Sequence, residues 1–168
     1  MEIYREWAMP NRWTFTIKPI KKLLEDYVKE GIWADPFAGK NSPASLTNDI
    51  NPERDTDYNM DALSFLRGLS SNSFDGVLYD PPYSIRQAKE CYDSYGVTAL
   101  EIKPNQMNYW SECKTEISRI LKKDGIVISF GWNSMGIGKT RGFEKIKILL
   151  VPHGGSRNDT ICTVERKK

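Results

Sequence analysis

The chain has 168 residues, 39% hydrophobic and 27% charged, which is typical of a soluble globular protein, and its net charge of +2 excludes nucleic-acid binding by overall charge alone. No apolar run approaches the roughly 20 residues of a membrane span, and the N-terminus has no apolar signal core, so we expect a cytoplasmic protein. One histidine, His153, and three scattered cysteines exclude a zinc site, which needs about four clustered ligands.

The first part of the chain alternates helical and extended patterns. Residues 18–31 predict a helix, because apolar side chains recur at helical spacing, Pro19 suits the first turn and Gly31 ends it. The strands predicted here are short: 32–35, 45–49 and a third strand edge within 55–60.

The second part continues this alternation. Residues 61–69 predict a helix with Asp61 at its start, and the apolar run 75–80 predicts a strand buried on both faces. The remaining predicted elements are a loop with some helix at 84–104, a helix at 106–123, a strand at 125–132, and two strands at 145–151 and 160–166 around a turn. This order predicts an α/β protein with a largely parallel sheet.

Two connections are unusually short. The stretches from Asp35 to Asp49 and from Asp49 to Asp61 are rich in proline and turn residues, whereas a parallel crossover normally needs about a dozen residues and a helix. We therefore expect reduced flanking helices and a partly bare sheet face. Bare apolar sheet favours association, so a homodimer or a partner subunit is expected on the 36–60 face.

The first strand end carries a carboxylate and a tight bend. Asp35 is followed by Pro36-Phe37-Ala38-Gly39, and a glycine at the carboxyl end of a strand lets the backbone approach a ligand closely. On its own, the pattern is equally compatible with an ordinary strand-to-loop turn.

Two more acids stand at the boundaries of predicted elements. Asp49 suits a ribose diol, whose two hydroxyls can donate to its two oxygens, but a turn aspartate before Pro52 has the same pattern. Asp61 is either the N-cap of its helix or a partner for an adenine amino group.

The strand at 75–80 runs into Asp80-Pro81-Pro82-Tyr83. The prolines restrict the backbone, which fixes the Asp80 carboxylate and the Pro81 carbonyl as neighbouring acceptors. Two acceptors match the two hydrogens of an exocyclic base amine, and the Tyr83 ring can stack on that base, a contact worth roughly 1–3 kcal/mol. A proline-rich strand exit with a packed tyrosine is the alternative.

Together these motifs resemble the class I S-adenosyl-L-methionine (AdoMet)-dependent amino-methyltransferases, in particular the DNA adenine-N6 methyltransferases. The D-P-P-Y motif of that family is matched at 80–83, its D-P-F-x-G-x-G loop at 35–41 with Asn41 as the last residue, and its Lys-Pro motif at 18–19. Asparagine can adopt the left-handed turn that a glycine would. The resemblance implies a single Rossmann-like domain over 1–168, with a mostly parallel seven-stranded sheet, an antiparallel C-terminal strand and no separate target-recognition domain.

The resemblance also implies roles for these residues. Asp80 and the Pro81 carbonyl would hold the adenine amine with its lone pair aimed at the methyl group, and transfer would be direct, without a metal. Tyr83 would stack on a base flipped out of the duplex, and Ser84 would also contact the substrate. The implied catalytic residues are Asp80, Pro81, Pro82 and Tyr83. The residues implied to bind AdoMet are Lys18, Asp35, Pro36, Phe37, Ala38, Gly39, Asp49, Asp61 and Asp80.

The loop after the strand at 125–132 contains Gly138-Lys139-Thr140, which looks like the end of a phosphate-binding P-loop. That motif needs a glycine where this chain has Asn133, so we reject a nucleotide triphosphatase. Instead, Lys139 and Arg141 are expected to contact nucleic-acid phosphates at the carboxyl edge of the sheet, with a solvated charged loop as the alternative. Arg86, Lys89 and Lys103 carry the same two alternatives.

Three functions are compatible with the sequence. The first is an AdoMet-dependent DNA adenine methyltransferase without a cognate nuclease. The second keeps the chemistry but acts on RNA. The third is a non-catalytic subunit that lends the fold to a partner, although such a subunit has no need to keep both Asp80 and Tyr83.

Overall fold

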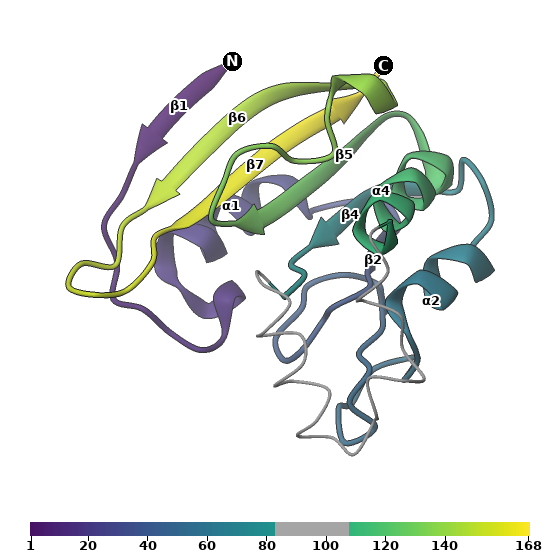
Figure 1. The fold of residues 1–168 in the computed structure, drawn as a ribbon, viewed down its shortest axis with the longest axis horizontal. Helices are drawn as coiled ribbons and strands as arrows, with labels where there is room; N and C mark the ends of the chain where they lie inside the picture. The colour runs from purple at the N-terminus through teal and green to yellow at the C-terminus, as the bar shows by residue number, and fades with distance from the viewer. Residues whose placement is uncertain (83–107) are drawn as a thin grey trace.

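A computed structural model describes residues 1–82 and 108–168, and the strands of these residues form one seven-stranded sheet (Figure 1). In chain order the elements are β1 (Glu2–Arg5), η1 (Thr14–Thr16), α1 (Lys18–Tyr27), β2 (Trp33–Asp35), β3 (Leu46–Thr47), α2 (Ala62–Gly68), β4 (Phe74–Tyr79), α4 (Tyr109–Ile120), β5 (Leu121–Gly131), η2 (Lys139–Arg141), β6 (Phe143–Val151) and β7 (Thr160–Lys167). The helices predicted at 18–31, 61–69 and 106–123 are thus confirmed as α1, α2 and α4.

The strand order is β1-β6-β7-β5-β4-β2-β3. Strand β7 is antiparallel to both β5 and β6, and every other pair is parallel. The predicted mostly parallel sheet with an antiparallel C-terminal strand is confirmed. Strands β2, β3, β4 and β5 therefore all end at one edge of the sheet, which we call the carboxyl edge.

One strand differs from the prediction. Residues 55–60 contribute only an isolated bridge between Asn48 and Tyr58, so the predicted third strand is wrong. The seventh strand is instead β1, which pairs with β6 at the other side of the sheet. Its sequence gives little signal, because Ile3 is exposed and only Tyr4 packs against the core.

The two faces of the sheet have different helical cover (Figure 1). On one face α1 buries Ile20, Leu23 and Leu24 against apolar side chains of the sheet. On the other face α2 and α4 pack together. The buried α2 and α4 side chains in that core are Leu63, Phe65, Leu66, Tyr109, Cys113, Ile117 and Ile120. Among residues 1–82 and 108–168, α1 is therefore the only α-helix on its face.

The short connections contain no helix, as expected. Residues 36–45 and 48–61 form turns and bends, and polar side chains hold them together. The fully buried Asn48 amide donates to the carbonyls of Pro36 and Met60 at 3.1 and 3.0 Å, and its oxygen accepts from Met60 N–H. Asn59 likewise donates to the carbonyls of Asp49 and Asn51. Hydrogen bonds from side-chain amides thus hold these two connections in place, where other parallel sheets have a crossover helix.

Both chain ends lie on the side of the sheet opposite to the carboxyl edge (Figure 1). Lys167, near the end of β7, is in register with Phe143, the first residue of β6. Within the part of the chain that the structure describes, no helix has the length and apolar character needed to cross a bilayer.

Candidate active site

The carboxyl edge contains a cleft of about 400 Å³. Residues that follow β2, β3, β4 and β5 form part of it. The rest comes from the N-terminal segment, the first residue of α2 and the β6–β7 turn with the start of β7. The predicted site residues that line it are Pro36, Phe37, Asp49, Asp80, Pro81 and Pro82. The structure thus places these six residues together at one edge of the sheet.

Asp35 lies beneath the cleft rather than in its lining. Its carboxylate is fully buried and accepts from the Phe37 N–H at 2.9 Å and from the Ser42 hydroxyl at 2.6 Å. Burial raises the pKa of Asp35 to about 7; these two donors oppose the rise, and the nearby Asp80 and Asp49 carboxylates add to it. Asp35 therefore shapes the loop that follows β2 from below.

Asp49 joins two loops at the cleft. One carboxylate oxygen accepts from Gly39 N–H at 2.9 Å and the other from Asn51 N–H at 2.8 Å. Each oxygen has a second lone pair, so the side chain can still accept from two ligand hydroxyls. This donor pattern orients the carboxylate before any ligand arrives.

The bend after β2 needs left-handed backbone at two positions. Gly39 has φ of 54° and Asn41 has φ of 67°, so the expected left-handed asparagine is confirmed. Ala38 and Gly39 do not line the main cleft but a smaller hollow beside it, together with Lys40. Ala38 and Gly39 therefore contribute to the site by setting the path of the backbone after Phe37.

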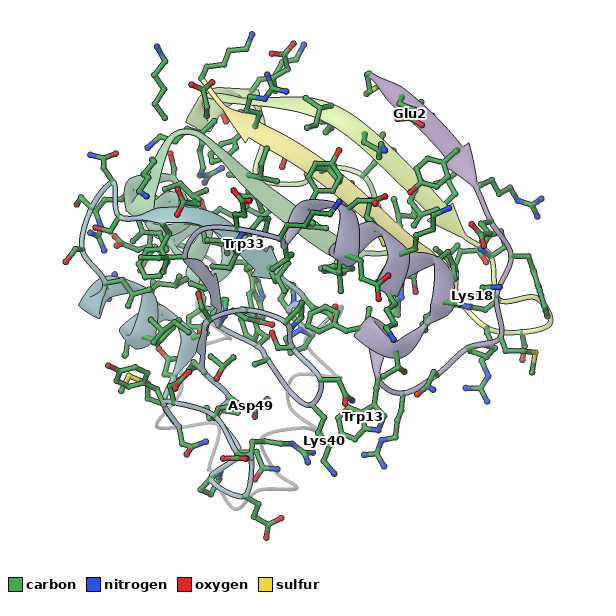
Figure 2. The ribbon with its side chains drawn as sticks, turned by 180° about the vertical axis from the view of Figure 1, so that it is seen from behind. Glu2, Trp13, Lys18, Trp33, Lys40 and Asp49 are labelled. Carbon is green, nitrogen blue, oxygen red and sulfur yellow. The ribbon has the colours of Figure 1, made fainter. Side chains whose placement is uncertain are left out.

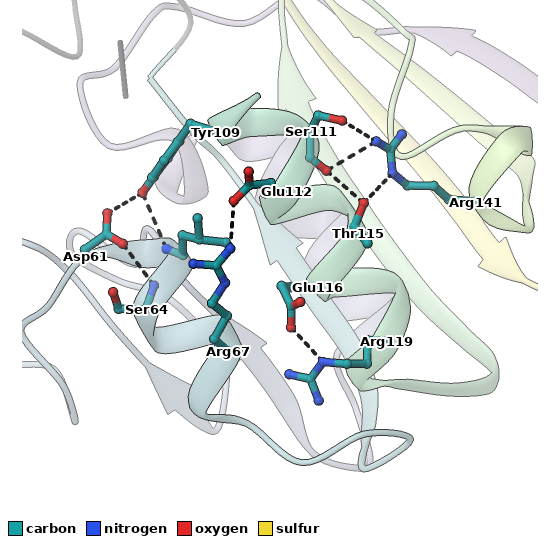
Figure 3. Close-up of polar contacts among 11 residues, drawn as sticks. Asp61, Ser64, Arg67, Tyr109, Ser111, Glu112, Thr115, Glu116, Arg119 and Arg141 are labelled. Carbon is teal, nitrogen blue, oxygen red and sulfur yellow. Dashed lines mark hydrogen bonds and ion pairs between the residues drawn. The ribbon is translucent and has the colours of Figure 1, made fainter. Parts of the chain in front are cut away.

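Asp61 caps a helix. One carboxylate oxygen accepts from Ser64 N–H at 2.9 Å and the other from the Tyr109 hydroxyl, which links α2 to α4 (Figure 3). Its neighbours Met60 and Ala62 line the cleft, but Asp61 does not. The N-cap alternative is therefore correct, and both oxygens are already engaged within the protein.

The D-P-P-Y motif begins at the cleft. Asp80, Pro81 and Pro82 line it directly after the buried strand β4. Tyr83 and Ser84 lie outside the described residues, as do Arg86, Lys89 and Lys103. The described part of the motif thus has the position that the sequence predicts.

A second cleft of about 370 Å³ shares Pro81, Pro82 and Trp132 with the first. Tyr79 and Ser129 line it and are register partners on β4 and β5, and Thr163 on β7 pairs with Ser129. Among the described residues, the buried hydroxyls of these three side chains find no hydrogen-bond partner. Burial also raises the pKa of the Tyr79 phenol. Tyr79 and Ser129 belong to the lining of the second cleft, whereas Thr163 lies outside it.

Three predicted binding residues lie away from the cleft. Lys18 is exposed at the start of α1, whereas Thr14 and Ile17 just before it line the cleft (Figure 2). Lys139 and Arg141 precede β6, which runs parallel to β5, so they lie at the amino edge of the sheet.

The expectation that Lys139 and Arg141 lie at the carboxyl edge is therefore wrong. The loop after β5 crosses the whole sheet before β6 begins, and the sequence pattern did not reveal this path. The Arg141 guanidinium instead binds α4, donating to Ser111 Oγ at 2.7 Å and to Thr115 Oγ1 at 3.2 Å (Figure 3).

Sequence reasoning missed the two walls of the cleft. The N-terminal segment contributes Arg12 and Thr14, and the β6–β7 turn contributes His153 and Arg157. The buried His153 ring joins these walls, because Nδ1 lies 3.0 Å from the Ala8 carbonyl oxygen and Nε2 lies 2.8 Å from Thr160 Oγ1. The only sequence signal was a lone histidine before two glycines, which we interpreted as a turn.

No family model and no curated protein matches the sequence, but solved structures share its fold. A SAM-dependent methyltransferase from Archaeoglobus fulgidus gives a TM-score of 0.59 at 12% identity, over 89% of this chain and 94% of that one. TrmN from Thermus thermophilus gives 0.55 at 14% identity, over 90% of this chain and 49% of that one.

A third similar structure is the 1,6-didemethyltoxoflavin-N1-methyltransferase of Burkholderia thailandensis, with bound 1,6-didemethyltoxoflavin and S-adenosylhomocysteine. It gives a TM-score of 0.56 at 13% identity, over 88% of this chain and 76% of that one. Likeness at such low identity establishes the fold alone: this chain has the Rossmann-like fold of the class I methyltransferases.

Proposed function

We propose that this chain is an AdoMet-dependent methyltransferase that methylates the exocyclic N6 amine of adenine in DNA. The observation that carries the proposal is the position of Asp80-Pro81-Pro82. This segment follows a buried strand and opens into the same cleft as Phe37 and Asp49. The fold adds support, because the similar structures are methyltransferases by name and one contains S-adenosylhomocysteine.

The cleft fits AdoMet in its volume and in the hydrogen-bond acceptors and apolar side chains that line it. A volume of about 400 Å³ lies within the usual range for small-molecule sites. Asp49 retains lone pairs for the ribose hydroxyls, and Phe37, Met60 and Ala62 offer apolar contacts to the adenine ring. We assign the methionine part to the start of the bend, at Pro36, which lines the cleft directly after β2.

Asp80 and the Pro81 carbonyl are the groups that we assign to the target amine. An adenine amine is a poor nucleophile, because its lone pair is delocalised into the ring. Two acceptors that bind its two N–H bonds favour a pyramidal nitrogen with a localised lone pair, and this orientation is the main contribution of the chain. AdoMet supplies a sulfonium methyl group that is already activated for direct displacement. Tyr83 and Ser84, outside the described residues, keep their proposed role as base contacts.

The first test identifies the product. The protein is incubated with isotopically labelled AdoMet and with duplex DNA, single-stranded DNA or RNA, and the modified nucleoside is identified by mass spectrometry. Labelled N6-methyladenine from DNA supports the proposal. Label only in RNA would show that the substrate is RNA and not DNA. No label in any nucleic acid would contradict the proposal.

The second test changes the acceptor. We expect Asp80→Ala to lower the rate of methyl transfer by about 100-fold or more, as loss of one placed polar group in an active site typically does. Its affinity for AdoMet, measured by calorimetry, changes much less. Asp26→Ala on the exposed face of α1 is the control and retains activity. Near-normal turnover by Asp80→Ala would rule out this role.

A further inference from the structure

Three cations surround one indole ring beside the cleft. The guanidinium carbons of Arg12 and Arg54 lie 4.8 and 5.1 Å from the centre of the Trp13 ring, and Lys40 Nζ lies 5.4 Å from it. The residues come from the N-terminal segment and from the connections after β2 and β3. We call these four residues the Trp13 cluster; Figure 2 shows Trp13 and Lys40 next to one another on the side of Asp49.

The cations of this cluster have no carboxylate partner among residues 1–82 and 108–168, since none of the three takes part in a salt bridge there. Glu53 and Asp55 line the same small hollow as Lys40 and Arg54, but neither is within salt-bridge distance of them. Three like charges around one ring repel one another, and the ring face offsets this only in part. An anion among them would relieve the repulsion.

The cluster is continuous with the proposed active site. Arg12 lines the main cleft, and Arg157 from the β6–β7 turn lines it as well. Trp132, whose side chain is 47% exposed, lines both clefts. Cations interleaved with aromatic rings are the combination that binds a nucleic-acid strand, because phosphates meet the charges and bases stack on the rings.

We propose that the Trp13 cluster, with Arg157, binds the phosphates that flank the target adenine, and that the Trp13 ring holds the three cations of the cluster in place for them. This rests on the proposed function and deepens it, because it names the residues that hold the DNA strand around the target adenine. The net charge of +2 makes the contact local: phosphates are bound at this rim and not over the whole surface.

The test measures binding of a fluorescein-labelled DNA duplex by anisotropy between about 50 and 200 mM salt. Lys40 and Arg54 are the residues to change, because neither lines the main cleft. We expect the Lys40→Gln/Arg54→Gln double variant to bind about tenfold more weakly for each lost cation at 0.1 M salt, and the salt slope to fall by about 2. The conservative Lys40→Arg/Arg54→Lys variant keeps the wild-type slope.

A matched control removes the same charge at the opposite edge. Lys123→Gln/Lys139→Gln leaves affinity and slope unchanged, because both lysines are exposed at the amino edge of the sheet. Trp13→Leu lowers affinity without lowering the slope, because the indole carries no charge. Equal effects of the two Gln pairs would overturn the proposal. Binding to vesicles of anionic lipid as tight as to DNA would overturn it as well.

These measurements separate the two proposals. DNA binding requires no methyl transfer, so the Lys40 and Arg54 variants report on the rim even if the protein methylates nothing. AdoMet binding, followed by calorimetry in the same variants, is expected to stay within about twofold of wild type. If wild type methylates adenine in DNA but the Lys40→Gln/Arg54→Gln variant binds DNA as tightly as wild type, the rim proposal fails while the methyltransferase proposal stands.

Discussion

Asp35 is a buried acid that holds the bend after β2 from below. Its pKa of about 7 is set mainly by burial, and the neighbouring acids Asp80 and Asp49 add to it. An unfolded aspartate has a pKa of about 3.9, so between these two values the folded protein binds more protons than the unfolded chain. The stability that this extra proton provides is present at acidic pH and is lost as the pH rises through about 7.

We therefore predict that Asp35→Asn flattens the pH dependence of stability. Wild type loses up to about 1.4 kcal/mol per pH unit through this group between about pH 4 and 7. The amide of the variant can still accept from Phe37 N–H and does not titrate. Urea unfolding at several pH values measures the free energy, with Asp124→Asn at an exposed position of β5 as the control. Parallel curves for wild type and Asp35→Asn would contradict the assignment.

For single residues, the sequence predicted where a side chain lies in the fold better than it predicted what the side chain does. Asp49 and Asp80 reach the cleft because residues that follow parallel strands meet at one edge, a rule that needs no tertiary detail. The role of Asp61 depended on Tyr109, 48 residues away along the chain, so local pattern could only leave two alternatives. His153 was missed because its partner Ala8 is 145 residues distant.

The elements α2 and α4 are joined by a polar seam. Asp61 binds the Tyr109 hydroxyl, and Arg67 donates to Glu112 at 2.7 Å (Figure 3). Arg119 reaches back to the carbonyl of Leu66. The Arg67–Glu112 pair is largely exposed and therefore adds little, whereas the Tyr109 hydroxyl is buried and depends on its partner.

Removing this cap tests the seam. We predict that Asp61→Ala lowers the free energy of unfolding by about 2 kcal/mol, because it removes the Ser64 cap and leaves the buried Tyr109 hydroxyl with a poorer partner. Tyr109→Phe costs less, and the double variant costs less than the sum of the two. Urea unfolding followed by circular dichroism measures the free energies of unfolding of wild type, both single variants and the double variant. Additive losses would show that the two side chains act independently.

Helices and buried strands followed from apolar periodicity, but edge elements did not. Strand β1 packs only Tyr4 against the core, and its pairing with β6 is made by backbone groups that every sequence has. Residues 55–60 failed to form the predicted strand because Thr47, on the neighbouring strand, donates its N–H and hydroxyl to the Asp57 side chain, both at 2.8 Å. Backbone pairing there is limited to Tyr58, which donates to the Thr47 carbonyl and accepts from Asp49 N–H.

In the described part of the molecule, helices cover one face of the sheet more fully than the other. This uneven cover supports the proposed partner on the 36–60 face. Lys40 and Arg54 of that segment belong to the nucleic-acid rim, so we assign the partner to its outer edge around Tyr58, whose side chain is 44% exposed. A homodimer or a partner subunit there would cover the edge beyond β3.

Light scattering tests this association. We expect the purified chain to have about twice its monomer mass, because the outer edge would bury apolar surface against a second copy. Tyr58→Asp shifts the mass towards the monomer, and Met135→Asp, a change at a more exposed apolar residue that follows β5, does not. A mass of one chain at every concentration, with and without DNA, would leave only a different partner subunit to be sought.

Both chain ends lie at the edge of the sheet that is opposite to the cleft. An affinity handle or dye attached to either one is therefore held away from the surface that would meet a substrate. Immobilised on a sensor by its N- or C-terminus, the protein would face its binding edge into the flowing sample. Surface-based kinetics should then agree with those measured free in solution.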